Sequence, residues 1–97
     1  MNSKTALCQC LLRGEVVNVR NIHSKTGYTN ASREIIRQVE RTEYNGFGVQ
    51  AKRTRRDAKN RYGVHCFWID YTLPQNSMNK EGIKKMKEYI KAQTKSK

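Results

Sequence analysis

The hydrophobic positions in the first forty residues predict three helices. Residues 4–13, 19–25 and 30–41 each repeat apolar side chains at helical spacing, so one face of each helix would be buried. Gly14 follows the first helix, and Gly27 suits the left-handed position that ends the second. The buried faces would comprise Leu7, Cys8, Leu11 and Leu12, then Val19 and Ile22, then Ala31, Ile35, Ile36 and Val39. We expect the three helices to share one core.

After residue 48 the pattern becomes that of two strands. Residues 49–56 alternate before becoming basic, and residues 64–73 form the most β-prone stretch of the chain. The loop 57–63 would join them as a hairpin, with which residues 15–17 would pair. Trp68 would either cover the N-terminal helix or contact a partner. The core face of the second strand would comprise Phe67, Ile69, Tyr71 and Leu73, and Cys66, set in the same apolar run, would be buried as well.

A lysine-rich amphipathic helix is predicted over residues 79–92. Ile83, Met86 and Ile90 form a narrow apolar stripe, and Asn79 is a candidate N-cap. The pattern leaves three alternatives open, namely docking on the body, pairing with a second copy, or ordering on nucleic acid.

The charge balance points to an anionic partner. The 97-residue chain has 20 Lys and Arg against eight Asp and Glu, a formal net charge of +12. Nucleic acid is the first candidate, an anionic membrane surface the second and an acidic protein the third. No apolar run approaches the roughly 18 residues of a membrane-spanning helix, and the N-terminus lacks the pattern of a signal peptide. We therefore expect a cytoplasmic protein that does not insert into a membrane.

The polar face of the third predicted helix carries a row of arginines. Arg33, Arg37 and Arg41 are spaced four apart opposite the apolar face, with Asn30 and Ser32 at the N-terminal end. A solvated face with glutamates paired to the arginines would look similar. The glycine turn before this helix favours a helix-turn-helix whose second helix enters the major groove of DNA.

The predicted hairpin adds a second group of cations. These would neutralise phosphates, whereas the helix arginines could read bases, because bidentate contacts to guanine discriminate between sequences and phosphate contacts do not. The hairpin group comprises Lys52, Arg53, Arg55, Arg56, Lys59 and Arg61.

The residues that could support catalysis or metal binding lack the usual spacings. No two of the titratable candidates suggest a catalytic pair, and C-x-C lacks the gap of structural zinc sites. An odd number of cysteines without an export signal favours reduced thiols. The residues considered for catalysis are His23, His65, Asp57 and Asp70, and those considered for zinc are Cys8, Cys10, Cys66 and His65. We expect no catalysis, no metal and no cofactor.

Residues 7–73 resemble the winged helix-turn-helix domains common in small phage and prophage proteins. The likeness lies in LLRGEVVNVRNIHSKTGYTNASREIIRQVE, NGFGVQAKR and KNRYGVHCFWIDYTL, the last containing the loop phrase Asn60-Arg61-Tyr62-Gly63 that is frequent in that family. The resemblance implies three helices, a small antiparallel sheet and duplex DNA binding, with the third helix in the major groove and the wing on the backbone or minor groove. The lysine-rich C-terminal helix and the very basic wing depart from that pattern, which keeps structured RNA or a ribonucleoprotein open as the partner.

These observations together predict an α+β fold. A winged helix-turn-helix domain over residues 1–74 would be followed by a linker and an extra basic helix over residues 75–97. The predicted function is duplex DNA binding by a small phage regulator or recombination accessory, as a monomer or a homodimer. The alternative is a phage-encoded interaction protein that inhibits or recruits a host protein or ribonucleoprotein, such as a defence nuclease.

Overall fold

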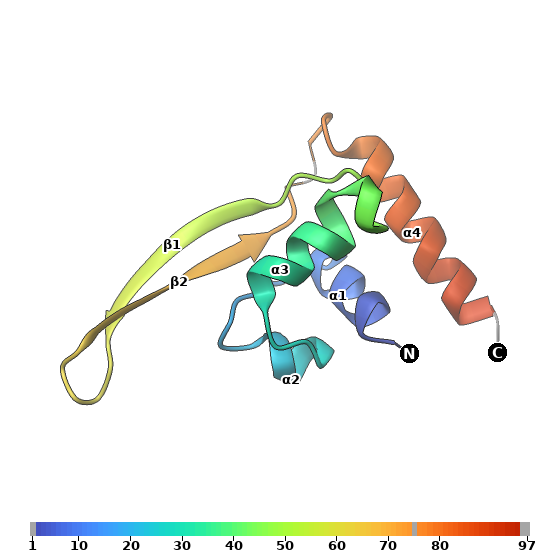
Figure 1. The fold of residues 1–97 in the computed structure, drawn as a ribbon. Helices are drawn as coiled ribbons and strands as arrows, with labels where there is room; N and C mark the ends of the chain where they lie inside the picture. Colours follow the sequence, from blue (N-terminus) through green and yellow to red (C-terminus); the bar gives the residue numbers. More distant parts are fainter. Residues whose placement is uncertain (1, 75, 96–97) are drawn as a thin grey trace.

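Within residues 2–74 and 76–95, which the computed structural model describes, the chain forms four α-helices and one antiparallel hairpin (Figure 1). The prediction of an α+β class is confirmed. None of the helices in this part of the chain is long and apolar enough to cross a membrane. The elements are α1 (Ser3–Leu12), α2 (Ile22–Thr26), α3 (Ala31–Ile35), the π-helical turn η1 (Ile36–Glu40), the 3-10 turn η2 (Thr42–Tyr44), β1 (Lys52–Lys59), β2 (His65–Thr72) and α4 (Lys80–Lys95).

The first two helices begin at asparagine side chains. Asn2 caps α1 by accepting a backbone N–H of its first turn at 2.8 Å. Asn18 and Asn21 cap each other, since the side-chain oxygen of each accepts the backbone N–H of the other. This turn delays the start of α2 to Ile22. The predicted helix start at residue 19 is therefore wrong, and Val19, expected in the core, is 58% exposed.

The helix that carries the arginine row is not regular to its end. Asn30 caps α3, as its side-chain oxygen accepts the Arg33 N–H at 3.0 Å. After Ile35 the backbone widens into η1, and Arg41 is already extended, with φ −92° and ψ 114°. The carbonyl of Val39 accepts the N–H of the returning chain at residue 47, which ends the helix. The prediction of one regular helix over residues 30–41 is wrong in its second half.

The hairpin projects away from the helices (Figure 1). Its strands pair from Lys52 opposite Thr72 out to Lys59 opposite His65. Tyr71 lies in the core at the base of the hairpin, but Phe67, further out on the same face, is 59% exposed. Cys66 is exposed as well. The predictions that Phe67 and Cys66 lie in the core are wrong, because strand alternation identifies the two faces but not how far the body covers them.

Val17 pairs with the base of the hairpin, as predicted for residues 15–17. The Val17 N–H donates to the Tyr71 carbonyl at 2.9 Å, and the Tyr71 N–H donates back at 2.7 Å. Since Tyr71 also lies opposite Arg53 of β1, β2 is the middle of three paired segments. The segment between α1 and α2 is thus tied directly to the hairpin.

The helix α4 docks on the body, which is one of the three alternatives left open by its pattern. Ile83 and Met86 are buried in the same core cluster as residues of α1 and α3. Asn79, which directly precedes α4, pairs with the backbone of Gln50: its Nδ2 donates to the carbonyl at 3.0 Å, and its Oδ1 accepts the N–H at 2.9 Å. The Asn79 side chain therefore joins the start of α4 to the chain entering β1.

Gly82 allows α4 to approach the segment 47–49 closely. A Cβ at this position would overlap Val49 Cγ2 and lie 2.8 Å from the carbonyl oxygen of Phe47. Only glycine fits this approach without displacement of the helix or the segment.

We predict that Gly82→Ala lowers the free energy of unfolding by about 1–3 kcal/mol, as expected for overpacking. This direction is opposite to that of helix propensity, which favours alanine by about 1 kcal/mol. Urea unfolding followed by circular dichroism measures the difference. Lys85→Ala, on the exposed side of the same helix, should change stability by less than about 0.5 kcal/mol. Equal stability of the two variants would contradict the close packing at Gly82.

Candidate nucleic-acid interface

The side chains predicted to contact DNA bases lie on the exposed side of the unit formed by α2, the turn and α3. Gly27 ends α2 with a φ of 85°, and four residues separate the two helices. Ser32, Arg33 and Arg37 are exposed along α3 and η1. The side-chain oxygen of Asn30 is engaged in the helix cap, which leaves its Nδ2 group for a partner.

The three arginines of the predicted row have different surroundings. An Arg33 nitrogen lies 3.9 Å from the carboxylate of the adjacent glutamate, and the Arg37 guanidinium lies 5.4 Å from the centre of the Tyr44 ring. Arg41 lies beyond η1 and is 3.7 Å from Glu43. Such exposed contacts contribute little to stability. Each arginine can therefore exchange its contact for a phosphate or a base.

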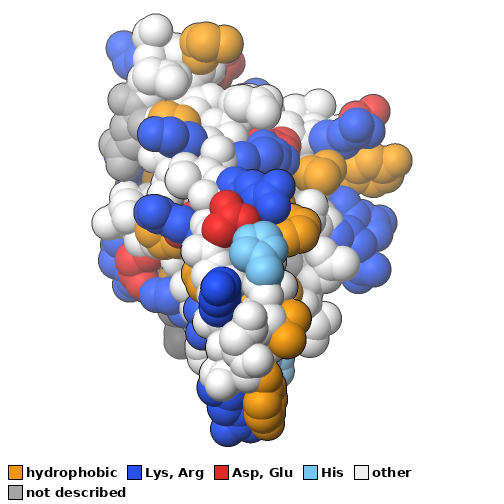
Figure 2. Space-filling view, turned by 90° about the vertical axis from the view of Figure 1, so that its left-hand side faces the viewer, with side chains coloured by type: hydrophobic (Ala, Val, Ile, Leu, Met, Phe, Trp, Pro, Cys, Tyr) orange, Lys and Arg blue, Asp and Glu red, His pale blue; other side chains and the backbone are white. Residues whose placement is uncertain are grey.

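The six hairpin cations fall into two groups. Arg53 and Arg56 are bound by carboxylates at the base of the hairpin. Arg55 is exposed, with its guanidinium 3.2 Å from Asp57 and 4.3 Å from the centre of the Phe67 ring. Figure 2, which views the molecule from the hairpin side, shows Lys and Arg side chains spread over this face among hydrophobic ones. The second group, without a buried carboxylate partner among the described residues, comprises Lys52, Arg55, Lys59 and Arg61.

Asp70 joins the hairpin to the segment before α2. Its Oδ1 accepts hydrogen bonds from Asn18 Nδ2 at 2.9 Å and Trp68 Nε1 at 3.0 Å, and its Oδ2 accepts one from Arg56 Nε at 2.8 Å. The residue is only 8% exposed. Arg56 above all, with Asn18 and Trp68, holds the pKa of the carboxyl below its ordinary value against the opposing effect of burial. Asp70 is therefore an ionised anchor for three segments of chain.

Glu40 holds the hairpin from the side of η1. Its two carboxylate oxygens accept hydrogen bonds from the two terminal nitrogens of Arg53, at 2.7 and 2.9 Å, and Oε2 also accepts the Ala51 N–H at 2.9 Å. Burial raises the pKa of Glu40, but the bonds from Arg53 and Ala51 outweigh burial and place the pKa below its ordinary value. Helix and strand are thus joined by a bidentate ion pair.

Val19 and Arg20, which the sequence pattern did not assign to the interface, lie beside it. Val19 and Ile69 line a small hollow of about 150 Å³ next to the N-terminal end of α3. The guanidinium of Arg20 lies 4.6 Å from the centre of the Trp68 ring, which is half-buried. Asn18 and Asn21, which flank Val19 and Arg20, were the signal available in the sequence. Asparagines that cap each other take the two residues between them off the buried face of a helix.

The residues considered for catalysis or metal binding do not gather at one place. His65 and Asp57 lie 3.0 Å apart on the exposed hairpin, whereas His23 is on α2. The thiols of α1 are buried, and burial raises the pKa of Cys8 to about 11. Among the described residues, no three His, Cys, Asp or Glu side chains are grouped closely enough to hold a metal ion.

A comparison with protein-family models, curated proteins and solved structures finds no match to this chain. The features of the molecule that bear on function are therefore the geometry of α3, η1 and the hairpin, and the two carboxylates that join them.

The lowered pKa values of Glu40 and Asp70 predict a loss of stability in acid. Each carboxyl binds its proton less readily in the folded state than in the unfolded state, so its contribution is complete above the ordinary pKa values of 4.5 and 3.8 and is lost as the pH falls through the lower folded values. Glu40→Gln should lower the free energy of unfolding by about 1–2 kcal/mol at pH 7, and by less at pH 3. Urea unfolding at several pH values measures this difference.

The control for that experiment is Glu43→Gln. Glu43 is 68% exposed and lies 3.7 Å from Arg41, so its replacement should leave both the stability and its pH dependence close to those of the parent. An equal effect of the two substitutions would mean that the Glu40 clamp does not stabilise the fold.

Proposed function

We propose that this protein binds duplex DNA as a winged helix-turn-helix domain, with α3 in the major groove and the hairpin along the backbone. The observation that carries the proposal is the combination of α2, a glycine-containing turn and α3 with a basic hairpin anchored beside them. A helix, such a turn and a second helix with a polar N-terminal end is the order of a DNA-reading unit. The resemblance of residues 7–73 to phage and prophage domains favours a role as a small regulator or recombination accessory.

The helix α3 and its continuation η1 supply the side chains that read bases. Arg33 and Arg37 are exposed and close to one turn apart, and a bidentate arginine contact to guanine contributes about 1–3 kcal/mol of discrimination. Asn30 and Ser32, at the beginning of the helix, suit a phosphate or the edge of an adenine. Arg41 lies past the end of η1 and is assigned to the backbone.

The hairpin supplies phosphate contacts, but its cations differ in role. Arg53 and Arg56 would give up bonds to Glu40 and Asp70 if they turned to phosphates. We assign these two to positioning of the hairpin. Phosphate neutralisation then falls to the other four cations, Lys52, Arg55, Lys59 and Arg61.

One observation favours the second candidate, a phage-encoded interaction protein directed at a host protein or ribonucleoprotein. The outer hairpin exposes large apolar side chains, with Tyr62 75% exposed and Val64 and Phe67 each 59% exposed. Exposed aromatic residues on a protruding element are typical of protein contacts. The two candidates differ in whether free DNA is bound.

The DNA-binding proposal predicts a steep dependence of affinity on salt. With about five phosphates neutralised, the logarithm of the association constant should fall with a slope near −4 to −5 against the logarithm of salt concentration. A fluorescence anisotropy titration with a random 30-base-pair duplex measures the slope, with the single strand and a hairpin RNA as comparisons. Affinity that hardly changes with salt would refute the electrostatic basis, and no binding to any of the three would favour the interaction protein.

Substitution of an arginine on α3 or η1 should change sequence preference, whereas substitution of an arginine on the hairpin should change affinity alone. Arg37→Gln should lower the ratio of the affinity for a selected duplex to the affinity for a random one by about fivefold to tenfold, because a base contact is lost. Arg55→Gln should weaken binding to both duplexes by a similar factor, because phosphates carry no base information. The two substitutions remove the same charge, so each serves as the control for the other. The reverse pattern would show that the hairpin, and not α3, reads the sequence.

A further inference from the structure

The outer part of the hairpin exposes two aromatic rings, Tyr62 of the loop and Phe67 of β2, here named the outer rings. These residues are 75% and 59% exposed, on an element that projects from the helices (Figure 1). Within the described part of the chain, no other aromatic ring packs on either of them. A large aromatic surface in water marks a site of contact with a partner.

An arginine covers one side of each outer ring. The guanidinium carbon of Arg55 lies 4.3 Å from the centre of the Phe67 ring, and that of Arg61 lies 5.1 Å from the centre of the Tyr62 ring. A cation is attracted to the face of a ring, and here it places positive charge beside the apolar surface. A side chain wedged between two base pairs of a duplex contacts bases on both of its faces. A ring with one face covered is suited instead to stacking on a single base.

The charge of the hairpin selects an anionic partner for the outer rings. Between residues 52 and 64, the six cations of the hairpin are accompanied by one acidic residue, Asp57. The Asp57 carboxylate lies 3.2 Å from the guanidinium of Arg55, which offsets its charge. Two copies of this hairpin would repel each other, which disfavours a second copy as the partner. Aromatic rings beside cations are the combination that binds single-stranded nucleic acid, through its bases and its phosphates.

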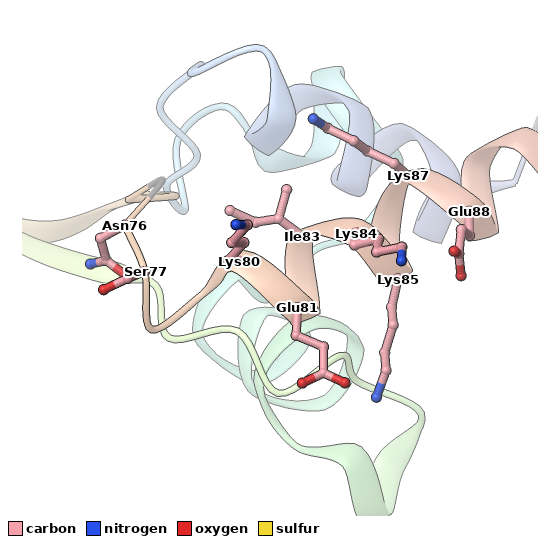
Figure 3. A pocket seen from close by; sticks show the side chains of 9 residues that line it. All are labelled: Asn76, Ser77, Lys80, Glu81, Ile83, Lys84, Lys85, Lys87 and Glu88. Carbon is pink, nitrogen blue, oxygen red and sulfur yellow. The ribbon is translucent and has the colours of Figure 1, made fainter.

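A larger hollow, of about 1010 Å³, follows α4 but lacks this combination. Figure 3 shows the carboxylates of Glu81 and Glu88 on the same helix as the lysines that line it. Its described lining residues have both signs of charge and include no aromatic ring. Cations and exposed rings occur together on the outer hairpin.

Phe67 lies on the face of the hairpin that borders α3. Ile69 and Tyr71 of β2 line the small hollow together with Asn30 and Ser32, at the N-terminal end of α3. Alternate residues of a strand share a face, so Phe67 continues this face toward the tip, about 7 Å further out than Ile69. Nucleic acid held by α3 therefore has the Phe67 ring within reach on the same side of the molecule.

We infer that the outer rings bind unpaired bases, so that the preferred ligand is a DNA duplex that continues into a single strand. This inference rests on the proposed duplex binding by α3. In a duplex the faces of the bases are covered by neighbouring base pairs, whereas a single strand leaves them free to stack on a side chain. Arg55 and Arg61, beside the rings, then contact phosphates of the same strand.

The test compares DNA ligands with equal numbers of nucleotides by fluorescence anisotropy. One is a blunt duplex of about 20 base pairs, and the other is a duplex of about 14 base pairs with a single-stranded extension of about 12 nucleotides, prepared in both polarities. The parent chain should bind one of the extended duplexes about tenfold more tightly than the blunt one, because stacking adds to the phosphate contacts. An extension of abasic nucleotides keeps the phosphates but removes the bases, and should abolish this preference.

Substitutions on the hairpin locate the effect at the rings. Phe67→Leu should lower the preference for the extended duplex by about fivefold to tenfold, since leucine is apolar but has no ring face, and should leave the affinity for the blunt duplex within about twofold. Phe67→Trp keeps a ring and should retain the preference. Val64→Ala is the matched control, because Val64 is as exposed as Phe67 but has no ring, and it should leave both affinities unchanged.

Several outcomes would overturn the inference. Equal affinity of the parent for the extended and the blunt duplexes would do so, and would favour a protein as the partner of the outer rings. An equal loss on both ligands in Phe67→Leu would show that the ring contacts paired DNA. Binding to anionic phospholipid vesicles that is tighter than binding to the extended duplex, and is lost in Phe67→Leu, would assign the rings to a membrane surface. Failure of the parent to bind any of the DNA ligands would overturn the proposed function as well.

Discussion

The carboxylate of Asp70 is the contact on which the arrangement of the hairpin depends. It accepts hydrogen bonds from Asn18, Trp68 and Arg56, which belong to the segment before α2, to β2 and to β1. A two-stranded hairpin is only marginally stable by itself. A nearly buried carboxylate that accepts hydrogen bonds from three donors gives the hairpin one orientation relative to α2, because leaving this charge unpaired in the interior is costly.

Glu40 repeats this solution on the other side of the hairpin base. It joins η1 to Arg53 and to the backbone at Ala51, so the hairpin is held both from the turn before α2 and from η1. The two carboxylates also divide the arginines into two kinds. Those at the base of the hairpin are used to build the fold, and those on α3 and the outer hairpin remain available to a partner. High positive charge is therefore compatible here with a defined structure.

The small core is extended by α4, which packs its apolar stripe on α1 and joins the chain entering β1 through Asn79. A chain of this length has little apolar surface to bury, and the docking of α4 adds to it. The same docking leaves the lysines of α4 from Lys80 to Lys91 on its exposed side. One amphipathic helix thus contributes to stability with one face and presents charge with the other.

The sequence by itself determined the helices, the hairpin and its position in the chain, since helical spacing, strand alternation and glycine turns are local signals. It also indicated which cations lie on α3 and the hairpin. Tertiary structure decided the rest. The return of the chain onto Val39 ended the arginine helix before Arg41, and the reach of the hairpin beyond the body exposed Phe67 and Cys66. The partners of Asp70 and Glu40 are 13 to 52 residues away, apart from Trp68 and the Ala51 N–H. Such contacts depend on how distant segments pack, and spacing along the chain does not encode them.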